Sequence, residues 1–259
     1  MRSHSVLKGV VAGFLALLSA AAFAQSSKDF SVGVGVAGVY RPVFMGSDRD
    51  ETTARPLLDI KWRNAIEVED YDMRINVYAG RHYRFGMILS YDEGRSSTES
   101  SNAQTKSVHS VDPTAMGGVF ASYFFDTWKF DFRLQQDIIN GNGTNGGFYA
   151  QAGVVYGAKV SPESKFTIGP RITYGSEDYM QSYFGVTAAD ARKSGMNRFT
   201  PSAGLRDAAI VGKFTYDITR NWVAVISLEY ATLMGDAKDS PLSRSDTYGV
   251  TSMGIMYKF

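Results

Sequence analysis

Hydrophobic and polar residues alternate along several segments of this chain, which is the pattern of a β-strand with two different faces. In the segment 128–137, one face is apolar and the other is polar or charged: Trp128, Phe130, Phe132 and Leu134 against Lys129, Asp131, Arg133, Gln135 and Asp137. A protein core tolerates such a charged face only if every group is paired. In a membrane barrel, by contrast, the polar face lines the lumen and the apolar face contacts lipid. This segment therefore predicts a strand of a transmembrane barrel.

The same alternation recurs along the rest of the chain and predicts about twelve strands. They lie near residues 30–40, 55–62, 65–70, 73–79, 83–92, 113–125, 128–138, 147–160, 165–175, 202–218, 222–234 and 247–259. Aromatic residues recur near the ends of these segments, as the girdles of a membrane barrel require. The fold that we expect is all-β: an antiparallel up-and-down transmembrane β-barrel with an even number of strands.

The connections between these segments differ in length in a regular way. Long connections near 41–54, 93–112, 139–146, 176–201 and 235–246 alternate with short turns, and the tight turn at Tyr71-Asp72 is the exception. In outer-membrane barrels, long loops face outward and short turns face the periplasm. We therefore expect both termini on the periplasmic side.

The N-terminal segment has the features of a cleaved signal peptide. Arg2 and Lys8 provide positive charge, Val10–Ala22 is apolar, and Ala22-Phe23-Ala24 fits a cleavage site. The apolar run is shorter than the roughly 20 residues that a membrane anchor needs. We expect a signal peptide at 1–24 and a single barrel domain at 25–259 in the cell outer membrane. A soluble periplasmic all-β sandwich or barrel is the alternative. The exposed aromatic faces and the terminal Phe259 favour the membrane barrel over this soluble fold.

Composition excludes some classes of function and leaves little material for catalysis. Removal of residues 1–24 takes away two basic side chains, which leaves 25 basic against 26 acidic residues, so the charge does not indicate a nucleic-acid partner. The chain has no cysteine, so neither disulfides nor thiol chemistry contribute.

The only two histidines after the signal peptide are His82 and His109. A Ser/His/Asp group can be drawn at His109 with Ser107, Ser110 and Asp112, but such residues are common in any polar loop. Asp48, Asp50 and Glu51 could hold a hard cation, yet a solvated acidic loop is the plainer interpretation. We expect no enzyme activity, no catalytic residue, no metal and no cofactor.

Charged residues at lumen-facing strand positions are the remaining candidates: Lys129, Asp131, Arg133, Asp137, Arg171, Lys213, Asp217 and Glu229. They favour neither sign, whereas a strongly selective pore is expected to favour one. Two interpretations stay open: the charges pair across the barrel and fill it, or they line a narrow water path.

Several short motifs resemble the MltA-interacting protein (MipA/OmpV) family of outer-membrane proteins. They run in family order across the chain: Tyr40, Gly46–Asp48, Arg55-Pro56, Asp112–Thr114, Gly169–Tyr174, Asp178–Thr187, Gly235–Pro241 and Tyr257–Phe259. The resemblance implies a non-enzymatic barrel that brings a lytic transglycosylase together with a murein synthase, and it carries no catalytic residues. Other members resemble adhesins or alter antibiotic susceptibility, so a narrow channel for polar solutes or antibiotics and a surface adhesin remain alternatives.

Three groups of residues follow as candidates for this role. Aromatic and apolar residues in the 176–201 loop are expected to fold over the barrel mouth as a plug or to contact a partner: Asp178, Tyr179, Met180, Tyr183 and Phe184. The terminal pair Tyr257 and Phe259 is the expected signal for the barrel assembly machinery. Turn residues Arg81, His82, Glu163 and Arg220 are the candidates for periplasmic contacts with murein enzymes, and outer-membrane lipid is the remaining expected partner.

Overall fold

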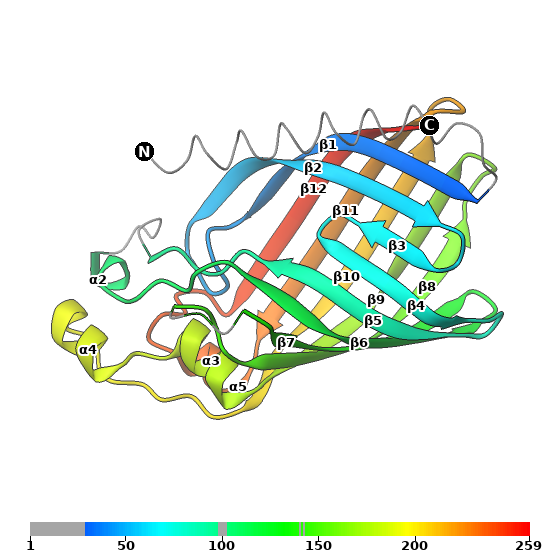
Figure 1. The fold of residues 1–259 in the computed structure, drawn as a ribbon. Coiled ribbons are helices and arrows are strands. Elements are labelled where there is room, and N and C mark those ends of the chain that lie inside the picture. Colours follow the sequence, from blue (N-terminus) through cyan, green and yellow to red (C-terminus); the bar gives the residue numbers. More distant parts are fainter. Residues whose placement is uncertain (1–28, 98–102, 140, 142) are drawn as a thin grey trace.

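The computed structural model describes residues 29–97, 103–139, 141 and 143–259, and they form a closed barrel (Figure 1). The expected signal peptide lies outside the described residues. The strands are β1 (Phe30–Pro42), β2 (Asp50–Trp62), β3 (Ile66–Glu69), β4 (Asp72–Ala79), β5 (Tyr83–Asp92), β6 (Thr114–Phe125), β7 (Trp128–Asp137), β8 (Phe148–Lys159), β9 (Ser164–Gly175), β10 (Gly204–Asp217), β11 (Trp222–Leu233) and β12 (Thr247–Lys258).

Every strand pairs antiparallel with its neighbours in sequence, and β1 pairs with β12 to close the barrel. The closing register places Gly33 opposite Lys258 and Tyr40 opposite Thr251. The predicted all-β, up-and-down barrel with about twelve strands is therefore confirmed.

The two ends of the barrel differ. The start of β1 and the end of β12 meet at one end, where the amide of Phe259 donates to the carbonyl of Val32 at 2.9 Å; we call this the short-turn end. The opposite end carries the helices α2 (Ala103–Lys106), α3 (Glu177–Phe184), α4 (Ala188–Ser194) and α5 (Gly235–Asp239) (Figure 1); we call it the long-loop end. Among the described residues, no helix is long and apolar enough to cross a membrane.

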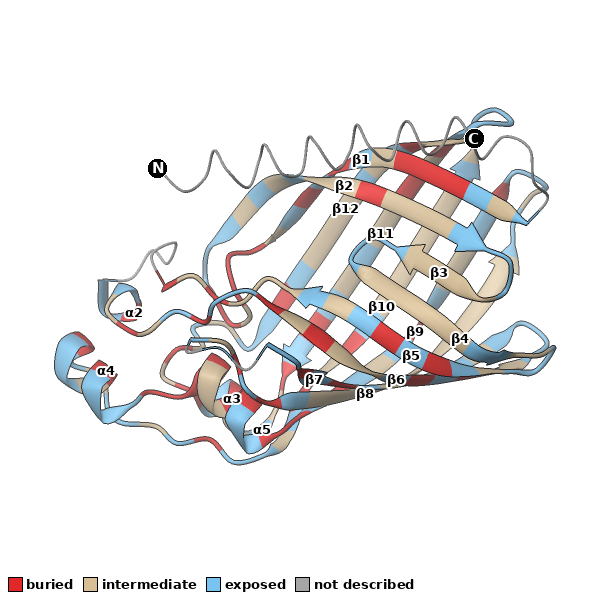
Figure 2. Cartoon of the chain, viewed as in Figure 1, coloured by how far each residue is buried: buried red, intermediate tan, exposed pale blue. Residues whose placement is uncertain are grey.

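Large apolar side chains are exposed at alternate positions along the outer wall, as the sequence pattern predicts. Examples on three strands are Tyr83, Phe85, Met87, Leu89 and Tyr91; Trp128, Phe130, Phe132 and Leu134; and Trp222, Leu228 and Tyr230. Many of the buried residues lie inside the barrel and beneath the helices of the long-loop end (Figure 2). An apolar outer band around a polar interior is the arrangement of a membrane barrel.

One predicted boundary is wrong in an informative way. The expected first loop at 41–54 shrinks to 43–49, because β1 and β2 pair as far as Pro42 opposite Asp50. Gly46 sits in this loop with a φ of 85°, a conformation that glycine adopts at little cost. The alternation of polar residues in 50–54 belongs to β2, where Glu51 forms an ion pair with Arg41 of β1 at 3.0 Å.

β3 is much shorter than its neighbours, and this leaves part of β2 with one partner. β3 has four residues and pairs only with Asp59–Trp62 of β2. Residues 50–58 of β2 pair with β1 alone among the described strands. Figure 1 shows β2 separated from β5 on the long-loop side of the β3–β4 hairpin.

Candidate functional site

Helix α3 packs against the inner wall at the mouth of the barrel, and we call it the plug. Ser176 caps its N-terminus by accepting from the amide of Tyr179 at 3.3 Å, and Glu177 and Asp178 lie in its first turn, where negative charge is favoured by the helix dipole. Its apolar residues recur at helical spacing and are buried: Tyr179, Met180, Tyr183 and Phe184. They pack against Ala209, Ala231, Leu233, Ala237 and Tyr248 from β10, β11, α5 and β12. Of the predicted loop residues, only Asp178 stays outside this cluster, exposed on the helix surface.

The plug approaches the barrel wall so closely that one position requires glycine. A Cβ on Gly147 would lie 2.7 Å from Oγ of Ser176 and 2.8 Å from Cα of Tyr179, which are closer than ordinary van der Waals contacts. The Ser176 hydroxyl accepts from the Phe148 amide at 3.0 Å, and the Ser176 amide donates to the Phe148 carbonyl at 2.9 Å. The start of α3 is therefore seated directly on the beginning of β8.

Tyr179 ties the plug to a charged group on β10. Its hydroxyl accepts from Nη1 of Arg206 at 2.5 Å, and Nε of Arg206 donates to Asp207 at 2.5 Å. Two consecutive residues can both reach inward because the register between β9 and β10 shifts between Leu205 and Asp207, as in a β-bulge. Burial raises the pKa of Tyr179 above its usual value, so this phenol stays protonated.

Tyr183 provides a second tie on the other side of the mouth. Its hydroxyl donates to Asp92 at the end of β5 at 2.5 Å. The neighbouring Ser182 hydroxyl donates to the carbonyl of Asn145 at 2.9 Å. Burial, and then the charge of nearby groups, raises the pKa of Tyr183 well above its usual value. The plug is thus anchored to β5, β8 and β10 by polar contacts as well as by its apolar face.

The eight predicted lumen charges all have partners, and four of them pair with one another. Arg171 contacts Glu229 at 2.7 and 3.0 Å, and Lys129 contacts Asp131 at 2.9 Å. The other contacts are Arg133 to Asp72 at 2.9 Å, Lys213 to Glu69, Asp217 to Lys258 at 3.7 Å, and Asp137 to the hydroxyl of Thr114 at 2.7 Å. Ion pairs between distant strands therefore compensate charge inside the lumen.

Sequence analysis missed several of these partners. Asp72 and Arg74 lie on β4, and Arg74 reaches Asp131 at 3.5 Å; Arg84 on β5 reaches Glu67 on β3 at 2.8 Å. The signal was present for Glu67, Arg74 and Arg84, because each alternates with apolar residues on a predicted strand, whereas Asp72 was placed in a predicted turn. Arg206 carried no such signal, since its inward position depends on the bulge.

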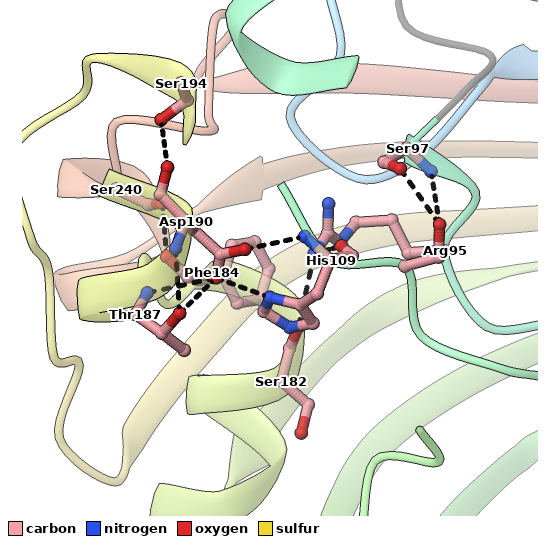
Figure 3. Close-up of polar contacts among 10 residues, drawn as sticks. Arg95, Ser97, His109, Ser182, Phe184, Thr187, Asp190, Ser194 and Ser240 are labelled. Carbon is pink, nitrogen blue, oxygen red and sulfur yellow. Dashed lines mark hydrogen bonds and ion pairs between the residues drawn. The ribbon is translucent and has the colours of Figure 1, made fainter. Parts of the chain in front are cut away.

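His109 belongs to a contact between loops rather than to the catalytic group drawn from sequence (Figure 3). Its Nδ1 lies 2.8 Å from Asp190, and its Nε2 lies 3.2 Å from the carbonyl of Ser182. Asp190 forms a capping box with Thr187 at the start of α4. Burial acts to raise the pKa of Asp190, but hydrogen bonds from Thr187 and His109 outweigh it and lower the pKa to about 2. This network fastens α4 to the segment before β6.

The serines near His109 point to other partners. The hydroxyl of Ser110 contacts that of Ser97 at 2.9 Å, and the hydroxyl of Ser107 donates to the carbonyl of Ala103 at 3.1 Å. The sequence-derived Ser/His/Asp arrangement is therefore not assembled.

The acidic residues expected in the first loop do not converge on a cation site either. Glu51 contacts Arg41, and Asp50 accepts from the hydroxyl of Tyr40. Within the described part of the chain, no group of three or more His, Cys, Asp or Glu side chains is arranged to hold a metal ion.

The short-turn end presents small polar features. Nδ1 of His82 lies 3.2 Å from the carbonyl of Phe124, and Glu163 accepts from the Ser161 hydroxyl at 2.9 Å, whereas Arg81 and Arg220 are exposed. The terminal aromatic residues lie on the outer wall, where the Tyr257 and Phe259 rings meet edge-on at 4.9 Å.

A cavity of about 430 Å³ lies beneath the plug. It extends from the interior, at Arg171, Arg206 and Tyr248, to the unpaired part of β2. Its charged lining includes five arginines and three acidic residues: Arg41, Arg55, Arg95, Arg171 and Arg206, with Asp92, Glu93 and Glu229.

The model of the family described as MltA-interacting protein MipA matches residues 34–259. The chain belongs to this family. Among curated MipA relatives, the MltA-interacting proteins of Escherichia coli (strain K12) and Shigella flexneri are each 26% identical over 93 residues, which cover 36% of this chain and 37% of the relative. This MipA-family protein is an outer-membrane barrel, as its fold and family indicate.

Solved barrels resemble the MipA-family chain in fold alone. The NanC porin is 13% identical and covers 87% of this chain and 100% of its own, with a TM-score of 0.48. The translocator domain of the autotransporter NalP from Neisseria meningitidis is 11% identical and covers 99% of this chain and 95% of its own, with a TM-score of 0.46.

Proposed function

We propose that this protein is a non-enzymatic scaffold of the outer membrane that holds peptidoglycan-remodelling enzymes, a lytic transglycosylase and a murein synthase, near the barrel. The observation that carries the proposal is the family match over 34–259. The relatives in Escherichia coli and Shigella flexneri are named for interacting with MltA. In this proposal, the short-turn end and both termini face the periplasm, where such enzymes are found.

The occupied mouth and the paired lumen charges support a scaffold over a narrow channel for polar solutes. α3 occupies the mouth and is held by Tyr179 and Tyr183. Deeper in the lumen, Arg171 pairs with Glu229, and Arg133 pairs with Asp72. Charges that neutralise one another across the barrel stiffen its wall and offer little attraction to an ion of either sign.

The contact surface in this proposal is the short-turn end. A groove there is lined by Asp29, Phe30, Ser31, Lys61, Arg63 and Asn64. Arg63 and Asp29 form an ion pair at 3.3 Å, but their side chains are 65% and 57% exposed, so both remain available to a partner. Arg81, His82, Glu163 and Arg220 in the neighbouring turns extend this polar surface.

Outer-membrane lipid and the barrel assembly machinery complete the proposed partners. The exposed apolar band contacts lipid. Tyr257 and Phe259 at the end of the chain are the residues that we propose as the assembly signal.

Photo-cross-linking in intact cells tests the scaffold. A photoreactive residue at position 63, 81 or 220 is expected to capture murein hydrolases or synthases, identified by mass spectrometry. The matched control carries the same residue at position 192 on α4, at the other end of the barrel, and is expected to capture neither. Capture of only lipid and assembly factors from the short-turn positions would contradict the proposal.

A further inference from the structure

The barrel wall has an opening between β2 and β5 at the long-loop end. The backbone carbonyl and amide of Leu58 point to the side of β2 that faces away from β1. The carbonyl accepts from the amide of Asp70 at 2.9 Å, and the amide donates to the Asp70 carboxylate at 3.4 Å. Because backbone groups in a strand alternate in direction, the nitrogen of Pro56 faces the same edge. Proline has no N–H to leave unpaired there, which is why it occurs at strand edges.

Side chains, rather than a ladder of backbone hydrogen bonds, bridge this opening. Glu93, directly after β5, contacts Arg55 of β2 at 2.6 Å and also contacts Arg41 of β1. The guanidinium of Arg55 also lies over the ring of Tyr71, 5.6 Å from its centroid. The side chains of these ion pairs are 23–32% exposed, and partly solvated ion pairs contribute little stability. The bridge can therefore open without breaking the sheet.

The cavity beneath the plug lies directly behind this bridge. Its lining includes residues from both sides of the opening, Arg41, Arg55 and Glu93, together with the interior residues Arg95 and Arg206. The cavity thus connects the opening in the wall with the space below α3.

Arg95 is a buried cation of this cavity that forms no ion pair with any described residue. Only 2% of Arg95 is exposed. Its Nη2 donates to the carbonyls of His109 at 2.8 Å and Ser182 at 3.5 Å, whereas Nε and Nη1 are buried and have no hydrogen-bond partner among the described residues. Burial lowers its pKa to about 10, so the group is still charged at neutral pH. A buried charge with unpaired donors is costly, and a bound anion removes that cost.

We propose that this cavity binds the phosphate-bearing headgroup of an anionic lipid, which reaches it from the bilayer through the opening between β2 and β5, with Arg95 as the binding cation. Tyr40, Tyr71 and Tyr91 are exposed around the opening. Exposed tyrosines mark the level of the headgroups in membrane proteins, so the opening meets the phosphate layer. Of the five arginines of the cavity, Arg95 is the one without a carboxylate partner among the described residues, which suits an anion. The proposal is independent of the scaffold function.

Native mass spectrometry of the full-length mature barrel in neutral detergent tests the binding site. The probes are phosphatidylglycerol, phosphatidylcholine with the same acyl chains, and inorganic phosphate. The wild-type protein is expected to retain phosphatidylglycerol in preference to phosphatidylcholine. Arg95→Gln is expected to weaken that binding by about tenfold or more, the effect of losing a hydrogen bond to a charged group. The exposed Arg192→Gln is the matched control and is expected to bind as the wild type does.

The outcomes separate the possible sources of the anion. Equal retention of the two lipids by the wild-type protein overturns the proposal without any variant. If inorganic phosphate binds as tightly as phosphatidylglycerol, the site binds a free anion rather than a lipid, and this result also overturns the proposal. Arg95→Lys keeps the charge and is expected to retain lipid even if Arg95→Gln folds poorly; loss of lipid from a folded Arg95→Lys barrel contradicts the assigned role of the charge.

The route is tested separately by exchange kinetics. Glu93→Gln removes the carboxylate that bridges Arg41 and Arg55, so bound phosphatidylglycerol is expected to exchange faster with lipid in the detergent solution. An unchanged exchange rate would show that the lipid does not pass between β2 and β5.

Discussion

Gly147→Ala is expected to loosen the plug without changing the strands. The new Cβ would overlap the backbone nitrogen of Tyr179, its nearest neighbour, and would lie 2.8 Å from Cα of the same residue. Because an ordinary contact needs 3.4 Å or more, the first turn of α3 must move by more than about 0.6 Å. The obstacle is helix backbone rather than a flexible side chain. Overpacking of this kind costs about 1–3 kcal/mol, which raises the population of the displaced helix about 5- to 150-fold.

Amide hydrogen exchange of α3 in the folded barrel measures this population. The amide of Met180, which donates to the Ser176 carbonyl at 2.8 Å, is expected to lose protection by the same factor, while amides of the β-ladder keep theirs. Gly204→Ala is the matched control, because a Cβ there meets nothing within 4 Å. Wild-type protection of α3 in Gly147→Ala would refute the close seating of the plug on β8.

Three further perturbations test other parts of the molecule. Arg171→Gln leaves the Glu229 carboxylate without its partner at 2.7 Å and is expected to lower the free energy of unfolding by about 1–3 kcal/mol. The double variant with Glu229→Gln is expected to lower the free energy of unfolding less. Equal urea midpoints for the wild type and the single variant would contradict the pairing. The pKa of Asp190 is about 2 in the folded protein and 3.8 for a free carboxyl, so its stabilisation of α4 is present above about pH 4 and is lost as the pH falls toward 2. Amide exchange of α4 between pH 6 and pH 2 is expected to show this loss of protection. Constant protection over this window would be inconsistent with the lowered pKa. Deletion of Phe259 is expected to lower the amount of assembled barrel in cells, measured by heat-modifiable migration on gels. The control variant Lys258→Ala is expected to assemble normally. Equal assembly of the two variants would argue against the terminal signal.

Alternation along the strands made the barrel predictable from sequence. Trp128, Phe130, Phe132 and Leu134 face outward because lipid contacts every second residue, and this requirement acts on each strand separately. The helix in the long-loop end was also within reach: Tyr179, Met180, Tyr183 and Phe184 recur at helical spacing behind a Ser176 cap. Sequence analysis expected these residues either to fold over the mouth or to contact a partner, and it did not predict a helix.

Features that depend on strand register were not predictable in the same way. Arg206 faces inward only because a bulge lies between Leu205 and Asp207, and alternation alone assigns one of two neighbouring residues to the lipid. A short strand at 65–70 was expected, but the opening beside β2 also depends on where that strand pairs along β2, which the hydrophobic pattern does not fix. Pro56 was the one local indication of an unpaired edge.

Single-channel recording of the purified wild-type barrel in a planar bilayer tests most directly whether the protein is closed at its mouth rather than an open pore. The plug at the mouth and the paired lumen charges predict no steady conductance, and Gly147→Ala is expected to add only brief openings. A large, stable and ion-selective current through the wild-type protein would contradict this account and make transport the function to pursue.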